Sequence, residues 1–305
     1  MRRIECLIGP EDDGRQVGSV LKARLNMGRQ GIRAAKFIEN GIMLDDRRVK
    51  TNERVSAGQT LSIVVGDTPA ALEGSGVEPT EGPLDIVLED DDLVVLNKPA
   101  GVSTHPGPEH ATDTLGNFLM AHFVRTGQQC LLHPVQRLDW GTSGLIVFAK
   151  NAHAQDFLQR RLHTGEFCRE YLAFCAGEFD LPAGTVDAPI GRVGKSWQTS
   201  AVVDGGKFAR THYALERCGQ LDDEGPVSLV RLQLETGRTH QIRIHMSHIG
   251  HPLLGDPYHG GSDRKIGRPA LHSAFLQVEP PVTHETLRFE APFPPDLQQL
   301  NDALI

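Results

Sequence analysis

Residues 135–149 read VQRLDWGTSGLIVFA. A polar loop with two glycines, 136–144, runs directly into five apolar residues, 145–149, which are typical of a buried β-strand. The loop therefore lies at the rim of a sheet and places a carboxylate there, Asp139, with Arg137 two residues before it. In an extended loop these two side chains project to the same side. They form either an active site or a structural ion pair.

The segments on either side of this loop predict a strand hairpin and a helix. Two apolar runs, 84–89 and 93–97, flank Asp90-Asp91-Asp92, which is a turn signal. After the hairpin, NKPAGVSTHPG at 97–107 has the composition of a loop, and taken alone it favours an ordinary surface loop. Beyond the strand, Asn151 is placed to cap a packing helix that follows it.

Further along the chain, two strands and a second helix are predicted. Residues 168–175 alternate as a strand and put Tyr171 on one of its faces, either as a site residue or as a core aromatic. Residues 227–235 also alternate. Thr239 is then expected to cap a helix, with Arg243 on a partly polar side. The apolar face of that helix carries Ile242, Met246 and Ile249.

Neither the histidines nor the cysteines of the chain form a strong metal motif. Four histidines gather around the last helix, at positions 240, 245, 248 and 251. A hydrolytic zinc helix needs a glutamate base between two such histidines, and this helix contains no acidic residue. The five cysteines are odd in number and scattered, without a C-x-x-C pair, so no thiolate zinc site or disulfide framework is predicted. We therefore expect no metal and no cofactor.

The formal net charge of −8 is unevenly distributed over the 305 residues. Residues 1–66 hold 12 basic and 8 acidic residues, whereas 67–92 hold 9 acidic residues and no lysine or arginine. The segment 66–83 is also rich in glycine and proline, which is typical of a linker. We predict a small basic domain at 1–66, an acidic flexible linker at 67–83 and a large domain at 84–305.

The small domain is predicted to contain two helices, at 17–25 and 32–38, followed by a sheet that includes 61–65. Its helices carry several basic residues, among them Arg29, Arg33 and Lys36. They either contact phosphates or form a solvated basic face. The run 14–65 resembles the small RNA-binding module named after ribosomal protein S-four, and that resemblance favours RNA.

No stretch of the chain approaches the ~20 consecutive apolar residues that a membrane span needs, and the N-terminus lacks the apolar core of a signal peptide. We expect a cytoplasmic monomer that does not contact membranes.

Several motifs of the large domain, taken in order, resemble the RluA family of RNA pseudouridine synthases. QRLDWGTSGL at 136–145 resembles the catalytic loop of that family, H-R-L-D-x-x-T-S-G-L, with Gln136 in place of the usual histidine. NKPAGVSTHPG at 97–107 and GRTHQIRIHMSHIGHPLLGD at 237–256 resemble the first and third motifs. Shorter matches are REYLA at 169–173, APIGR at 188–192, GKFARTHYALE at 206–216 and RPALHSAFL at 268–276.

The resemblance implies an α/β fold of the α+β kind, with a mixed, largely antiparallel sheet crossed by an RNA cleft. It assigns the catalytic carboxylate to Asp139 and, to Arg243, the cation that keeps this carboxylate ionised. Arg137 would fill the space left by a flipped uridine, Tyr171 would pack on the flipped uracil, and Leu271 would line its pocket. Other expected RNA contacts are Thr142 and Arg238, together with Arg29, Arg33 and Lys36 of the small domain.

The implied reaction isomerises uridine to pseudouridine in structured RNA. We expect large-subunit ribosomal RNA as the target, with transfer RNA as the other option. The alternative is a catalytically silent RNA-binding or ribosome assembly factor of the same fold. The set of Arg137, Asp139, Tyr171 and Arg243 argues against that alternative, because a protein that only binds RNA does not need all four.

Overall fold

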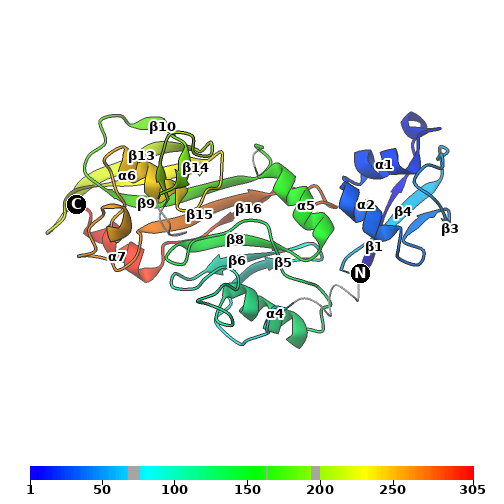
Figure 1. Cartoon of the computed structure of the whole chain (residues 1–305), viewed down its shortest axis with the longest axis horizontal. Helices are drawn as coiled ribbons and strands as arrows, with labels where there is room; N and C mark the ends of the chain where they lie inside the picture. Colours follow the sequence, from blue (N-terminus) through cyan, green and yellow to red (C-terminus); the bar gives the residue numbers. More distant parts are fainter. Residues whose placement is uncertain (68–75, 163, 194–199) are drawn as a thin grey trace.

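The computed structural model describes residues 1–67, 76–162, 164–193 and 200–305. These residues form a four-stranded sheet near the N-terminus, a ten-stranded sheet and a two-stranded ribbon (Figure 1). None of the helices within these ranges has both the length and the apolar character that crossing a membrane requires.

The N-terminal sheet and its helices enclose a core of their own. The strands are β1 (Arg2–Leu7), β2 (Ile42–Leu44), β3 (Arg47–Arg48) and β4 (Thr60–Val65), in the order β1-β4-β2-β3. The helices are the 3-10 turn η1 (Pro10–Asp12), α1 (Val17–Arg24) and α2 (Arg29–Ala35). Helix α2 ends three residues earlier than predicted, and Phe37 beyond it is exposed instead of continuing the apolar face. The buried residues of this core include Val17, Val20, Leu21, Ile32, Leu61 and Ile63.

The large sheet is mixed and mostly antiparallel, as predicted. Its main path runs β10-β13-β14-β9-β15-β8-β6-β5, with β16 paired to β15 and β7 to β8. Within the described residues, only β8 and β15 pair in parallel. The strands are β5 (Ile86–Glu89), β6 (Leu93–Lys98), β7 (His133–Pro134), β8 (Ser143–Ala149), β9 (Cys168–Ala176), β10 (Ala183–Asp187), β13 (Arg210–Leu221), β14 (Gly225–Leu234), β15 (Leu271–Val278) and β16 (Leu287–Glu290). The ribbon consists of β11 (Ile190–Arg192) and β12 (Ser200–Val202).

Helices cover both faces of this sheet. They are α4 (Leu115–Arg125), α5 (Ala152–Arg161), α6 (Gln241–His248), the 3-10 turn η2 (Pro257–His259) and α7 (Pro295–Ala303). Ile146 and Phe148 of β8 belong to the core that includes α4, whereas Val147 belongs to the core that includes α5. Strand β8 is therefore buried on both faces, which is why its sequence is apolar without alternation. The predicted cap of α5 is confirmed, because Asn151 accepts a hydrogen bond of 2.8 Å from the Ala154 amide.

The parallel pair β8–β15 brings two distant parts of the chain to one edge of the sheet. His272 lies opposite Ser143, and the Ser143 hydroxyl is 2.9 Å from Nδ1 of His272. Gly144 has φ +106°, and a Cβ there would collide with the Ser273 carbonyl, so this close approach requires glycine. As a result, the loop before β8 and the loop before β15 emerge side by side.

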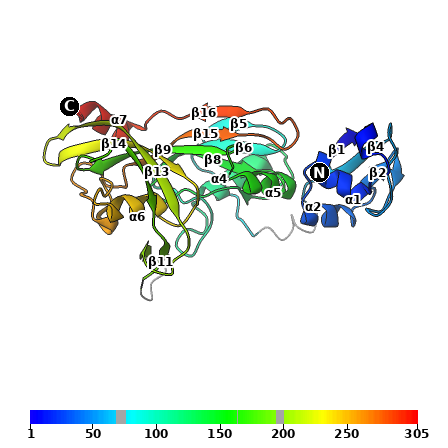
Figure 2. The ribbon, with the colours of Figure 1, turned by 90° about the horizontal axis from the view of Figure 1, so that it is seen from above.

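The predicted boundaries of the linker and the two domains stay a prediction, and residues 68–75 lie outside the described residues. On either side of them the chain contacts the large sheet region. Asp67 accepts a 2.7 Å hydrogen bond from the Leu131 amide, and the Asn117 side chain of α4 donates to the Glu78 carbonyl at 2.8 Å. Helix α5 lies next to the N-terminal unit (Figure 2), where Arg160 donates to the Asn26 carbonyl at 2.7 Å.

Candidate active site

A cavity of about 680 Å³ opens where the loop before β8, strand β9 and the start of α6 meet. Seven of the ten predicted site residues line it: Arg137, Asp139, Thr142, Tyr171, Arg238, Arg243 and Leu271. The other three, Arg29, Arg33 and Lys36, are exposed on α2 and at its C-terminal end, in the N-terminal unit. The structure thus separates the predicted residues into one cavity and one basic helix.

Asp139 faces two basic side chains from α6 and its N-terminus. Its Oδ2 lies 3.7 Å from Nη1 of Arg243 and 4.0 Å from Nε2 of His240. The carboxylate remains 24% exposed, so it is open to a ligand in the cavity. Arg137 is exposed and forms no ion pair with any described residue, so the alternative of a structural pair with Asp139 is wrong.

Arg243 is aimed at Asp139 by a second carboxylate. Asp256 is almost completely buried and binds the guanidinium at two points, with Nε–Oδ2 at 2.6 Å and Nη2–Oδ1 at 2.7 Å. This bidentate geometry fixes the plane of the guanidinium. Only Nη1 is left to face Asp139. Asp256 is the last residue of the motif at 237–256, and its position in the sequence does not indicate this role.

A buried lysine anchors the loop that carries Asp139. The Lys98 side chain has no exposed surface, and its ammonium donates to the carbonyls of Pro99 at 2.9 Å, Val102 at 2.7 Å and Trp140 at 3.3 Å. Burial lowers the pKa of Lys98 to about 7, against the opposing effect of the Asp139 charge. The interpretation of 97–107 as an ordinary surface loop is therefore wrong at Lys98.

Two further contacts hold the backbone of this loop. Arg268 donates to the Gly141 carbonyl at 3.0 Å, and its guanidinium is held by Asp296 at 2.6 and 2.9 Å. The Thr104 hydroxyl donates to the Leu138 carbonyl at 2.7 Å. The loop is thus tied by three side chains from two separate segments, 97–107 and the segment before β15, which orients Asp139 before any ligand binds.

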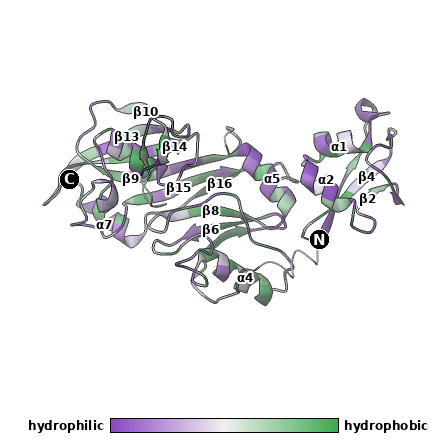
Figure 3. Cartoon of the chain, viewed as in Figure 1, coloured by the Kyte–Doolittle hydropathy of each residue, from purple (hydrophilic) through white to green (hydrophobic). Residues whose placement is uncertain are grey.

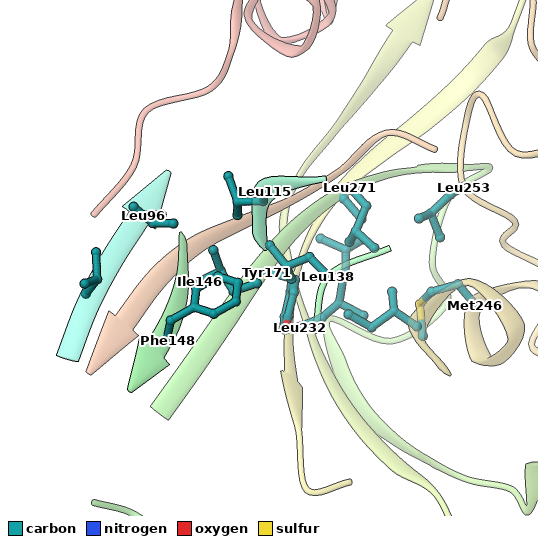
Figure 4. Close-up of a cluster of buried hydrophobic side chains, with 14 of the residues drawn as sticks. Leu96, Leu115, Leu138, Ile146, Phe148, Tyr171, Leu232, Met246, Leu253 and Leu271 are labelled. Atoms are coloured by element: carbon teal, nitrogen blue, oxygen red, sulfur yellow. The ribbon is translucent and has the colours of Figure 1, made fainter. Parts of the chain in front are cut away.

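Tyr171 and Leu271 form the apolar wall of the cavity. Tyr171 lies in the buried cluster beside Leu138 and Leu232 (Figure 4), and it is 4% exposed. Burial raises the pKa of its hydroxyl. Tyr171 is therefore both a core aromatic and a cavity residue, so the two alternatives for it are compatible.

The start of α6 differs from the prediction. The N-cap residue is His240 in the left-handed region, with φ 55° and no side-chain cap bond, so the assignment of Thr239 as N-cap is wrong. The four histidines also have different surroundings: buried His245 contacts Thr211 and Ala188, and His251 stacks on Phe179. The described residues contain no group of three or more His, Cys, Asp or Glu that could hold a metal ion.

The candidate site is a carboxylate paired with an arginine, in an apolar-walled cavity on a mixed sheet. The fold is that of the pseudouridine synthases. The solved structure of Human RNA Pseudouridylate Synthase Domain Containing 1 superimposes with a TM-score of 0.58 and 29% sequence identity, covering 72% of this chain and 89% of that chain.

Residues 92–248 match the family model described as RNA pseudouridylate synthase. The Uncharacterized RNA pseudouridine synthase YhcT of Bacillus subtilis is 38% identical over 98% of this chain and 96% of its own length. The Ribosomal large subunit pseudouridine synthase D of Haemophilus influenzae is 36% identical over 97% and 93%. The chain belongs to the RNA pseudouridylate synthase family, in its RluA branch, and is an isomerase that converts uridine in RNA to pseudouridine.

Proposed function

We propose that this enzyme modifies uridines of large-subunit ribosomal RNA and that Asp139 is its catalytic carboxylate. The target is supported by relatives named Ribosomal large subunit pseudouridine synthase D in Haemophilus influenzae and Escherichia coli O157:H7, each 36% identical to this chain. The carboxylate is supported by one observation above all, the 3.7 Å approach of Arg243 to Asp139 in the cavity.

The chemistry explains why such a pair is needed. Pseudouridine formation breaks the N1–C1′ bond of uridine, turns the freed uracil and rejoins it through C5. An ionised carboxylate at the ribose either adds to C1′ or stabilises the positive charge that develops there. Arg243 places a positive charge 3.7 Å from the Asp139 carboxylate at the reacting sugar.

The other cavity residues fit the handling of a flipped base. A stacked uridine must leave its helix to react, which costs a few kcal/mol. Arg137 is exposed at the cavity and unpaired among the described residues, so it is free to occupy the vacated space. Tyr171 offers a flat apolar face to the uracil, with Leu271 beside it. Thr142 and Arg238 also line the cavity and complete the proposed RNA contacts.

We further propose that residues 1–66 act as an S-four-type RNA-binding domain, joined by the linker 67–83 to the catalytic domain 84–305. Arg29 and Arg33 are four residues apart on α2, and Lys36 follows at its end, so the three exposed cations share one side of the helix. The ribbon of α2 in Figure 3 carries the purple colour of hydrophilic residues along part of its length. Such a cluster adds affinity through phosphate contacts.

The relatives named for ribosomal RNA are bacterial, which supports a cytoplasmic site of action. The site is built within one chain, so we propose a monomer. Size-exclusion chromatography with light scattering at micromolar protein will test this, and a dimer mass would contradict it.

The test is to map pseudouridines in total RNA from cells with and without the protein, and from cells that carry Asp139→Asn. We expect sites in large-subunit ribosomal RNA that disappear in both altered strains. Sites confined to transfer RNA would overturn the proposed target. Sites that persist with Asp139→Asn would overturn the role of Asp139. If the wild type adds no pseudouridine while the strain lacking it shows a ribosome assembly defect, the silent assembly factor is correct.

A further inference from the structure

Two histidines form a chain that leads from Asp139 to the protein surface. Nε2 of His240 faces Oδ2 of Asp139 at 4.0 Å, and Nδ1 of the same ring lies 3.3 Å from Nε2 of His259. The two rings meet edge to face, with centroids 5.4 Å apart. His259 belongs to η2 and is partly exposed, whereas His240 lines the cavity. One end of the chain is thus at the reacting carboxylate and the other at solvent.

The strained backbone conformation of His240 indicates that the imidazole ring itself is needed at this position in the cavity. Its φ of 55° is in the left-handed region, which is uncommon for residues other than glycine and strains the backbone. Glycine or asparagine would hold the same backbone with less strain, and neither would place an imidazole in the cavity. The distance of 4.0 Å to Asp139 is too long for a hydrogen bond. Nε2 therefore remains available to a ligand.

Both rings are neutral near pH 7. Burial lowers the pKa of His240, with Asp139 opposing that shift and Arg243 adding to it. Burial also lowers the pKa of His259 to about 4, against the opposing charge of Asp256. The charged groups that face the pair are therefore Asp139, Arg243 and Asp256, together with Arg137. Because the rings are neutral, His240 has an unprotonated ring nitrogen that can accept a proton, and the charges of Asp139 and Asp256 offset part of the lowering of its pKa.

We propose that His240, backed by His259, accepts the proton that C5 of the uracil must release after the new carbon–carbon bond has formed. This inference rests on the proposed function. When C5 joins C1′, C5 still carries its hydrogen. The C5–H electron pair then forms the C5=C6 double bond, the C6=N1 pair moves onto N1, and N1 takes a proton from water.

In this step the C5 proton binds to Nε2 of His240 while Nδ1–H donates to His259. His259 then passes a proton to solvent, so one proton is released for each proton that N1 takes up. Tyr171, the other candidate in the cavity wall, is less suited to this step. Its hydroxyl is buried and its pKa is raised, which disfavours the phenolate that would have to act as the base.

The first experiment separates the C5 proton from the earlier bond changes. Total RNA labelled with [5-³H]uridine, from cells that lack the protein, releases tritium only when C5 loses its hydrogen. An RNA fragment with 5-fluorouridine at the mapped site has no proton on C5 of the target. Formation of its C5-linked product therefore measures cleavage of the N1–C1′ bond and formation of the C5–C1′ bond, without the later loss of the C5 proton. We expect His240→Gln to slow tritium release about 100-fold and to form the fluorinated product within twofold of the wild-type rate. His248→Gln, an exposed histidine on the same helix, is the matched control and should match wild type in both assays.

A second variant uses the backbone geometry. Glycine tolerates φ 55°, so His240→Gly should fold, and added imidazole should restore its tritium release in proportion to the neutral imidazole present. Equal loss of both reactions in His240→Gln, without rescue of His240→Gly, would show that His240 only orders Asp139 and would overturn the proposal. Unchanged tritium release would overturn it as well. If the wild-type protein itself releases no tritium, the proposed function fails. This outcome differs from failure of the His240 proposal, in which wild type releases tritium and only the behaviour of the variants departs from expectation.

Discussion

Asp256 holds Arg243 by two hydrogen bonds of 2.6 and 2.7 Å, and both side chains are buried. The arginine that faces Asp139 is therefore oriented by another carboxylate, thirteen residues further along the chain.

The first prediction concerns this pair. Asp256→Asn should lower the free energy of unfolding by about 3–5 kcal/mol, because it leaves a buried guanidinium without its partner charge. It should also lower kcat about 100-fold, since Nη1 of Arg243 is no longer directed at Asp139. Urea unfolding and tritium release measure the two effects. Asp263→Asn, an exposed neighbour, is the control, and equal behaviour of the two variants would contradict the prediction.

The second prediction is a pH dependence caused by Lys98. Its pKa is about 7 in the folded protein and close to 10.5 in the unfolded chain, so between these values the unfolded state binds more protons. Raising the pH across this window therefore favours the folded state. Relative to Lys98→Met, the free energy of unfolding of wild type should rise between pH 7 and 10, by at most about 1.4 kcal/mol per pH unit. Urea unfolding of both proteins at several pH values tests this, and a difference that stays constant with pH would refute the lowered pKa of Lys98.

The third prediction concerns base flipping by Arg137. Arg137→Ala should leave stability unchanged, because the side chain is exposed and unpaired among the described residues. It should lower kcat/KM about 10- to 100-fold, equivalent to about 1.4–2.8 kcal/mol, on an RNA whose target uridine is stacked in a helix. On the same sequence with the target already unstacked, the loss should be much smaller. Equal losses on the two RNAs would show that Arg137 does not assist flipping.

The fourth prediction concerns the basic helix of the N-terminal unit. Replacing Arg29, Arg33 and Lys36 together by glutamine should weaken RNA binding, and it should reduce the slope of log K against log[salt] by about 2 to 3. Turnover at saturating RNA should be unchanged, because these residues lie outside the cavity. Replacing the exposed Lys265 and Arg288 is the control. A changed turnover with an unchanged slope would contradict an RNA-binding role.

The elements that depend on residues close together in the sequence were predicted correctly. The hairpin β5–β6, the apolar strand β8 and the Asn151 cap each depend on residues a few positions apart, and the structure confirms them. The pairing of Asp139 with Arg243 was expected only through the family resemblance, because these residues are far apart in the chain. No local pattern places them in one cavity.

The features that the sequence interpretation missed depend on contacts between distant segments. Lys98 sits between an asparagine and a proline and therefore has a surface-like context, yet three carbonyls from two loops bury its ammonium. His240 replaces Thr239 as the N-cap because Gln241 begins the helix one residue later than the threonine pattern predicts. Four histidines lie in or next to the predicted helix, at 240, 245, 248 and 251. His259 lies beyond this helix, so the sequence pattern does not predict its contact with His240.

The parallel pairing of β8 with β15 also has a consequence for how the enzyme matures. Contacts between residues about 130 positions apart are slow to form, and during synthesis they must wait for the later segment to leave the ribosome. A nascent chain that ends before β15 has Asp139 but lacks the strand that aligns its loop. The alignment of the Asp139 loop against β15 therefore has to wait until residues 271–278 have been synthesised, well after the loop itself.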